Sequence, residues 1–134
     1  MSTAAATTRE ARALLEARAL VSRLASEGRH HVAAAVLTEG GLYTGINLEC
    51  TLPRACVCAE AVAIGAACAA EPGARILHSV AVNRRGEIIP PCGPCRELLA
   101  DFGPDADVAV AEGETAALRD LLPRAYKGHL RFEE

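Results

Sequence analysis

Two short cysteine-containing segments constrain this chain more than any other feature of its sequence. The first is Cys58-Ala59-Glu60, and the second, about thirty residues later, is Pro91-Cys92-Gly93-Pro94-Cys95. The C-x-x-C spacing lets two thiolates bind one zinc ion, and Cys58 would complete a three-cysteine set. Both segments are expected to open helices, whose N-terminal amides stabilise thiolate charge. A fold that uses all three cysteines must therefore bring two helix N-termini together.

Three protein ligands leave a fourth tetrahedral position for water, which is the pattern of catalytic zinc sites. Zinc would lower the pKa of that water, so that hydroxide forms near neutral pH. Glu60 follows Cys58 by two residues and could take the water proton, then deliver it to a ring nitrogen and a leaving amine. This set of residues is known from zinc-dependent base deaminases. The segments therefore predict Zn2+ bound by Cys58, Cys92 and Cys95, with Glu60 as the catalytic proton carrier.

Other interpretations of these residues stay open. The C-x-x-C pair could be a redox pair or half of a structural zinc site, and a closed four-thiolate site could use Cys56. Cys68 lies ten residues after Cys58 in the same expected helix, about 15 Å along its axis, and is interpreted as a core residue. Glu60 could be only a favourable charge at a helix start. The first ten residues lack the basic and apolar stretches of a secretory signal, so we expect reduced cysteines in the cytoplasm rather than disulfides.

Composition favours small-molecule chemistry. The 134 residues suffice for one domain with a hydrophobic core, and 51% of them are hydrophobic. Aromatic residues make up 3% and the formal net charge is −3, which argues against a polynucleotide partner. No stretch approaches the roughly 20 consecutive apolar residues of a membrane helix.

Hydrophobic periodicity predicts an α/β fold. Helices are expected over Thr8–Glu27, Cys58–Ala70 and Cys95–Phe102, and strands over Val32–Leu37, Leu42–Ile46, Ile76–Val82 and Val108–Ala111. The first two strands should form a hairpin, and Asn47–Val57 should be a loop. Thr115 is predicted to cap a last helix that stops near Pro123. This order of elements predicts one mixed sheet covered by helices.

At these residues the chain resembles the small zinc-dependent cytidine deaminases of pyrimidine salvage. Gly45-Ile46-Asn47-Leu48-Glu49 is similar to the family's Gly-x-Asn-Val-Glu, and Leu121-Leu122-Pro123-Arg124-Ala125-Tyr126 is similar to its Leu-Leu-Pro-x-x-Phe. The resemblance implies a three-layer α/β/α sandwich with a mixed central sheet. It further implies a single cytidine-deaminase-like domain over residues 1–134, with an N-terminal helix in 1–28 and a catalytic core in 32–126.

The same resemblance implies a small-molecule nucleoside substrate. Cytidine or deoxycytidine would be converted to the uridine form with release of ammonia. Asn47 and Glu49 would hold a ribose hydroxyl, and the backbone around Ala59 and Pro90 would border the amine. Tyr126 would reach a neighbouring subunit's site in a homotetramer. From the residues alone, Asn47 could instead order its own loop and Glu49 could be a solvated charge.

Some positions depart from the family pattern. Gly28-Arg29-His30-His31 stands where the family has Pro-Tyr-Ser-x-Phe, and Ala61 replaces an arginine that offsets the charge of three thiolates, a role for which Arg96 and the helix ends are candidates. His30 and His31, expected on opposite faces of a strand, could not readily share a metal, but one could line the pocket. His78 and His129 are interpreted as ordinary histidines.

The chain is also similar to blasticidin S deaminase, so the same hydrolysis on another aminated heterocycle or nucleoside antibiotic is the alternative function. A non-enzymatic structural zinc module is a further one.

Overall fold

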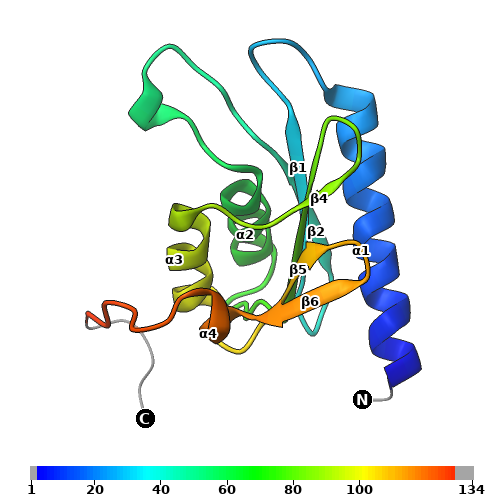
Figure 1. The fold of residues 1–134 in the computed structure, drawn as a ribbon, viewed down its shortest axis with the longest axis vertical. Helices are drawn as coiled ribbons and strands as arrows, with labels where there is room; N and C mark the ends of the chain where they lie inside the picture. The colour runs from blue at the N-terminus through cyan, green and yellow to red at the C-terminus, as the bar shows by residue number, and fades with distance from the viewer. Residues whose placement is uncertain (1–2, 129–134) are drawn as a thin grey trace.

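A six-stranded mixed sheet forms the middle layer of the protein, whose computed structural model describes residues 3–128 (Figure 1). Its strands are β1 (Val32–Leu37), β2 (Leu42–Ile46), β3 (His78–Asn83), β4 (Ile88–Ile89), β5 (Asp107–Ala111) and β6 (Glu114–Ala117). Five of them lie in the order β2-β1-β3-β5-β6, and β4 pairs with one end of β3. β3 and β5 are parallel, whereas the other paired strands are antiparallel.

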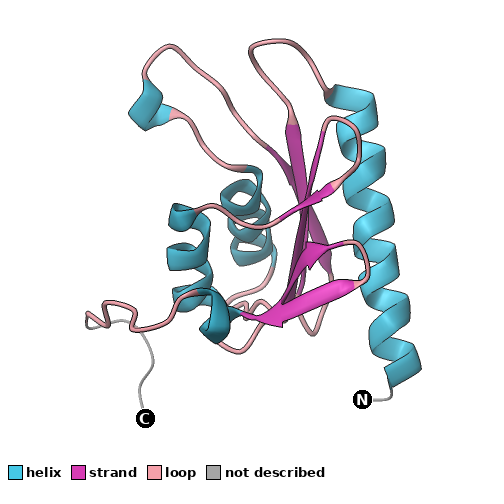
Figure 2. Cartoon of the chain, viewed as in Figure 1, coloured by secondary structure: helices cyan, strands magenta, loops and turns pink. Residues whose placement is uncertain are grey.

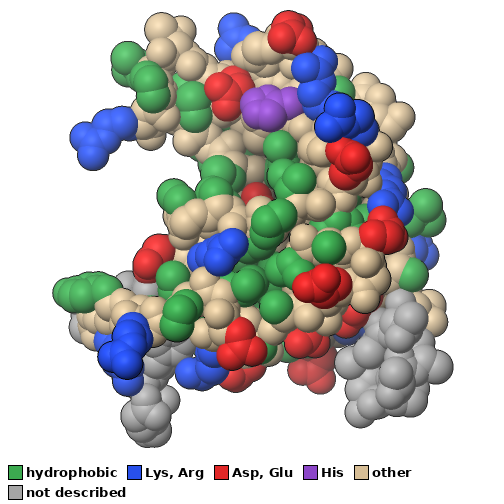
Figure 3. All heavy atoms as spheres, viewed as in Figure 1, with side chains coloured by type: hydrophobic (Ala, Val, Ile, Leu, Met, Phe, Trp, Pro, Cys, Tyr) green, Lys and Arg blue, Asp and Glu red, His purple; other side chains and the backbone are tan. Residues whose placement is uncertain are grey.

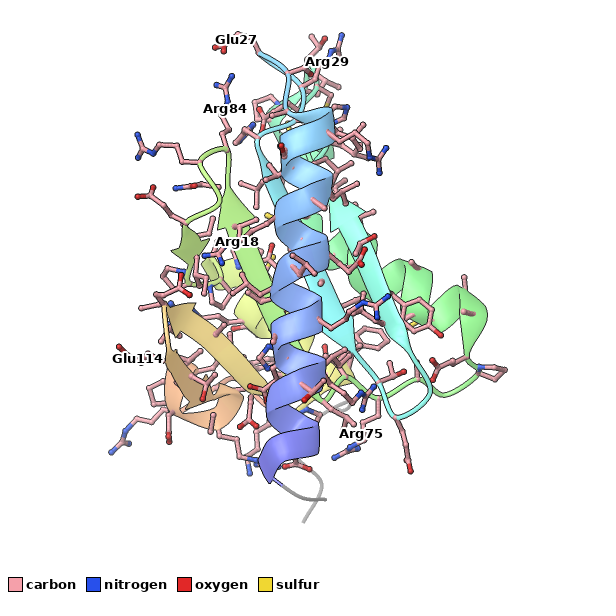
Figure 4. All side chains as sticks on the ribbon, turned by 90° about the vertical axis from the view of Figure 1, so that its right-hand side faces the viewer. Arg18, Glu27, Arg29, Arg75, Arg84 and Glu114 are labelled. Atoms are coloured by element: carbon pink, nitrogen blue, oxygen red, sulfur yellow. The ribbon has the colours of Figure 1, made fainter. Side chains whose placement is uncertain are left out.

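Helices cover both faces of the sheet and complete the three-layer α/β/α sandwich. The helix α1 (Thr3–Leu24) crosses one face, where its side chains pack on β1 and β3 (Figure 4). Beyond its end, Glu27 and Arg84 form an ion pair of 3.1 Å. The opposite face carries α2 (Ala59–Ala70), α3 (Gly93–Phe102) and α4 (Leu118–Leu121) (Figure 2). Within residues 3–128, no helix combines the length and apolar character needed to cross a membrane.

Alanine is the commonest residue in both hydrophobic clusters, one on each face of the sheet. Such small side chains allow close approach of the layers, as at Gly45 on β2. A Cβ atom added there would lie 2.5 Å from both the carbonyl oxygen of Ala59 and the nitrogen of Ala63. Glycine at this position therefore lets the first turns of α2 lie directly against the sheet.

Most elements match the prediction from sequence, and the differences lie at the ends of helices, in the Asn47–Val57 loop and in two short strands. The helix expected over Thr8–Glu27 instead spans Thr3–Leu24. Thr115 does not cap a helix, because Gly113, at a φ of 70°, forms a turn that folds Glu114–Ala117 back onto β5 as β6. The last helix begins only at Leu118. The Asn47–Val57 loop contains a short 3-10 helix, η1 (Pro53–Ala55), and β4 was not anticipated.

His78 is an uncompensated polar group in the sheet. Its side chain is 5% exposed, its Nδ1 has no hydrogen-bond partner, and Glu10 Oε2 on α1 lies 3.8 Å away. Burial lowers the pKa of His78 to about 4, although nearby Asp107 acts in the opposite direction. Burial also raises the pKa of Glu10. His78 is therefore a core histidine held in its neutral form; His129 lies outside the described residues.

We expect the free energy of unfolding to fall as the pH drops from about 6.5 to about 4. In this range His78 binds a proton in the unfolded state but stays neutral in the folded state. The full loss attributable to this residue is about 3 kcal/mol, and the raised pKa of Glu10 offsets part of it. Urea unfolding at several pH values measures the slope of the free energy of unfolding against pH. The His78→Gln variant should show a flatter slope, and an identical slope in both proteins would contradict the assignment.

Candidate metal centre and active site

Three thiols meet where the N-termini of α2 and α3 come together. Cys58 is the N-cap residue of α2, Cys92 is the N-cap residue of α3, and Cys95 lies in the first turn of α3. Their sulfur atoms all lie within 4.8 Å of one another, with 3.5 Å between Cys58 and Cys92. Among the side chains that the structure describes, this is the one group of three potential metal ligands found. The three cysteines singled out from sequence are therefore brought together.

The local sequence explains both junctions. Pro90 and Pro91 keep the chain extended before Cys92, and Pro94 suits the first turn of α3, where no amide hydrogen is needed. Before α2, the backbone of Val57 pairs with Leu48 in an isolated antiparallel bridge that directs the chain into the helix. Each cysteine thus leaves an extended segment just as a helix begins.

The donor set fits a zinc ion. Tetrahedral zinc with Zn–S bonds of about 2.3 Å places its sulfur ligands about 3.8 Å apart, which the observed cluster approximates. Burial raises the pKa of the Cys58 thiol, and the neighbouring Cys92 adds to the effect. Burial, followed by the Glu60 carboxylate, raises the pKa of Cys95. These two thiols therefore hold their protons more tightly than an exposed cysteine, and a divalent cation would displace those protons on binding.

Glu60 lies beside this cluster in the first turn of α2. The residue is 5% exposed, and its carboxylate is in hydrogen-bond contact with the Cys95 thiol. Burial raises the pKa of Glu60, while its own backbone N–H and Cys95 oppose the shift. A carboxylate with a raised pKa next to a metal site is suited to exchange protons near neutral pH.

Two of the three thiols, Cys58 and Cys92, line a pocket of about 350 Å³, whereas Cys95 is buried behind it. The lining of this pocket comprises His31, Val32, Asn47, Glu49, Pro53, Cys56, Val57, Cys58, Ala59, Glu60, Ile89, Pro90 and Cys92. Figure 3 shows the molecule hollowed on this side, between the loop that carries η1 and the helices α2 and α3. A larger hollow of about 720 Å³ lies between α1 and the β1–β2 turn, but its lining contains none of the predicted site residues.

Asn47 ties the pocket wall together. Its Oδ1 accepts hydrogen bonds from the backbone N–H groups of His31 (2.6 Å) and Val32 (3.0 Å), and its Nδ2 lies 3.3 Å from His31 Nδ1. The His30 ring Nδ1 lies 2.7 Å from the Asn47 carbonyl oxygen. Both histidines precede β1, so the predicted placement on opposite faces of a strand is wrong. Of the two, His31 lines the pocket, a role that sequence reasoning left open.

Glu49 faces His31 at the pocket, with 4.0 Å between its Oε1 and His31 Nε2. Both side chains are 43% exposed, so they are accessible to a ligand. The structure thus brings Asn47, Glu49 and Ala59 to the same pocket as Glu60 and the thiols of Cys58 and Cys92. The role of His31 at the pocket had one signal in the sequence: a histidine stands where the family has an aromatic segment.

The remaining predicted residues lie outside this pocket. Tyr126 is 82% exposed on the C-terminal segment and does not line it. Arg96 donates hydrogen bonds from Nε to the carbonyl of Pro91 (2.8 Å) and from a terminal nitrogen to that of Leu121 (3.0 Å). Its guanidinium therefore joins the loop before Cys92 to the end of α4. Its role in offsetting the charge of the thiols stays a prediction.

Comparison with known proteins agrees with this geometry. Residues 7–112 match the family model for the cytidine and deoxycytidylate deaminase zinc-binding region. The chain is 32% identical over 117 residues to a blasticidin-S deaminase from Bacillus cereus, covering 79% of this chain and 84% of that protein. It is 33% identical over 94 residues to a cytidine deaminase from Mycobacterium tuberculosis, covering 70% of each.

Solved structures give the same result. The cytidine deaminase from Mycobacterium leprae superposes with a TM-score of 0.74 at 28% identity, covering 84% of this chain and 96% of that one. The enzyme from Burkholderia pseudomallei superposes with a TM-score of 0.70 at 31% identity, covering 86% and 98%. The predicted fold, zinc chemistry and hydrolytic deaminase activity are thereby confirmed. The chain belongs to the cytidine and deoxycytidylate deaminase family of zinc-dependent enzymes.

Proposed function

We propose that this deaminase acts on cytidine or deoxycytidine, which it converts to uridine or deoxyuridine with release of ammonia. The observation that carries the proposal is the buried Glu60 carboxylate beside the three thiols, at a pocket whose rim bears Glu49. In this proposal Cys58, Cys92 and Cys95 hold the zinc ion. When bound, zinc lowers the pKa of a water molecule and so supplies a nucleophile near neutral pH.

The chain's own residues move the protons and hold the ring. Glu60 takes one proton from the attacking water and passes it to the ring nitrogen. It then takes the remaining proton of the added hydroxyl and passes it to the leaving amine. Its buried position supports this cycle, because the raised pKa lets one carboxyl group accept and return a proton. The backbone at Ala59 and Pro90, which line the pocket, borders the departing amine.

Asn47 and Glu49 recognise the ribose in this proposal. Glu49 offers an accessible carboxylate for a ribose hydroxyl, and Asn47 orients the wall through its hydrogen bonds to His31 and Val32. Tyr126, exposed on the C-terminal segment, would contact the base in a neighbouring subunit of a homotetramer. We further propose a single catalytic domain that serves pyrimidine salvage in the cytoplasm.

The alternative substrate is blasticidin S or a related aminated nucleoside antibiotic. Similarity to the Bacillus cereus blasticidin-S deaminase extends over 79% of this chain, which supports the alternative. His31 and Glu49 also make the pocket entrance more polar than the aromatic segment expected from the family. The two substrates share the same hydrolysis and differ in what the entrance recognises. Ammonia release from cytidine, deoxycytidine, blasticidin S and cytosine separates them directly.

Loss of one ligand thiol should remove zinc. We expect Cys58→Ser to lower the zinc affinity by at least about 100-fold, because the set of three thiolates becomes two. Metal analysis of the purified protein measures the change. Cys68→Ser is the matched control and should retain zinc, since Cys68 lies outside the cluster and is exposed, so its interpretation as a core residue is wrong. Equal zinc content in the two variants, or zinc loss in Cys56→Ser, would refute the three-thiol site.

Glu60→Gln keeps the size of the side chain but removes its ability to carry protons. We expect the turnover number for the best substrate to fall by about 10²–10⁴-fold while zinc content stays at the wild-type level. Ammonia release and metal analysis on the same sample test both statements. Glu114→Gln, at an exposed position on β6, is the control and should retain activity. A fully active Glu60→Gln enzyme would exclude the proposed mechanism.

Glu49→Gln tests recognition of the ribose. Removing the charged acceptor should lower kcat/KM for cytidine by about tenfold, the cost of losing a hydrogen bond to a charged group. Free cytosine has no ribose, so its turnover should change little. Steady-state kinetics on both compounds provide the comparison. Equal losses for cytosine and cytidine would show that Glu49 does not bind the ribose. Turnover of blasticidin S alone would show that the antibiotic, not cytidine, is the substrate.

A further inference from the structure

A second thiol pair lies at the edge of the pocket, separate from the metal cluster. The sulfur atoms of Cys50 and Cys56 are 3.6 Å apart. Cys50 is exposed and Cys56 is partly buried, with Cys56 lining the pocket. Neither belongs to the group of three potential metal ligands. The deaminase mechanism uses neither thiol, so their proximity needs another explanation.

The loop backbone already holds these two cysteines together. Leu48 and Val57 exchange two backbone hydrogen bonds, of 2.9 and 3.0 Å, which close the base of the loop. Inside this base, the Cys50 N–H donates to Cys56 Sγ at 3.4 Å. The 3-10 helix η1 returns the chain between them (Figure 2). A disulfide needs the sulfurs at about 2.05 Å, so they must approach by only about 1.5 Å.

We propose that Cys50 and Cys56 form a reversible intramolecular disulfide with a low-molecular-weight disulfide as the oxidant. The exposed Cys50 sulfur attacks the oxidant, forms a mixed disulfide and releases one small thiol. Cys56 sulfur then attacks the Cys50 sulfur and releases the second small thiol. The two protein thiols lose two protons and two electrons, and both are gained by the oxidant as it becomes two thiols.

The disulfide would alter one wall of the substrate pocket. Cys56 and Pro53 line that wall, and Glu49 directly precedes Cys50. Drawing Cys56 towards Cys50 displaces the wall next to the carboxylate assigned to the ribose, so this consequence rests on the proposed function. We expect the KM for the nucleoside to rise by about three- to tenfold on oxidation, since ångström-scale misplacement weakens substrate positioning. The turnover number should change less than the KM, because Glu60 and the metal thiols lie outside the loop.

The test uses the zinc-loaded Cys68→Ser protein. With Cys68 removed and three cysteines on zinc, only Cys50 and Cys56 should react with a thiol reagent under native conditions. After treatment with oxidised glutathione, we expect both thiols to disappear, the mass to fall by two hydrogen atoms, and the zinc content to stay constant. Dithiothreitol should restore both thiols and the original KM. In Cys50→Ser/Cys56→Ser/Cys68→Ser, oxidant should leave the KM at that variant's own reduced value.

Three outcomes would overturn the proposal. A persistent glutathione adduct or unreacted thiols would show that the pair does not close. Loss of zinc on oxidation would show that the ligand cysteines react instead. A complete disulfide with an unchanged KM would refute the effect on the pocket. Thiol counts and mass need no turnover, so a protein inactive on every tested amine would refute the proposed function while the disulfide itself is still decided.

Discussion

The close contact between Gly45 on β2 and the first turns of α2 is the constraint on which the active site depends. No side chain separates the strand from the backbone of Ala59 and Ala63. The start of α2 is therefore held at a set depth against the sheet, together with Cys58 and Glu60. Any larger residue at Gly45 would push the helix outward, and Cys58 and Glu60 with it. The positions of Cys58 and Glu60 thus depend on how closely α2 packs on the sheet.

The second half of the site depends on how α3 is attached. Arg96 binds the carbonyl of Pro91 in the loop before α3 and that of Leu121 at the end of α4, so one side chain fixes both segments around Cys92 and Cys95. β3 and β5 run parallel on either side of this helix in the sequence, as expected when a helix crosses between them. The two cysteine-bearing helix ends are consequently held in place by separate sets of contacts.

Local patterns predicted what local forces determine. The strands Val32–Leu37 and Leu42–Ile46 were predicted to the residue, because Glu39-Gly40-Gly41 marks their turn. The apolar side chains of the first strand are mostly buried, and those of the second are partly buried. The cysteine spacing likewise indicated the metal cluster. Thr115 was misassigned because a threonine suits both a cap and a strand, and the turn at Gly113 decides between them.

The position of His31 was not predictable for a different reason. Its orientation depends on Asn47, which reaches it only after β1 and β2 have paired. The paired thiols Cys50 and Cys56 are a similar case, since the backbone bridge between Leu48 and Val57 brings them together. Contacts of this kind form only when the chain folds, so no periodic pattern in the sequence indicates them. They make up most of the pocket wall.

The alanine-rich core makes this protein unequally tolerant of sequence change. In most cores the damaging substitutions remove volume, but Ala33, Ala34 and Ala35 on β1 have little volume to lose. Added methyl groups are the greater danger here, because helix and sheet backbones already lie close to one another. Substitutions in this core are therefore limited mainly by the largest side chain that each position can hold. Variation that preserves the enzyme should accumulate on the outer faces of the helices and in the loops away from the pocket.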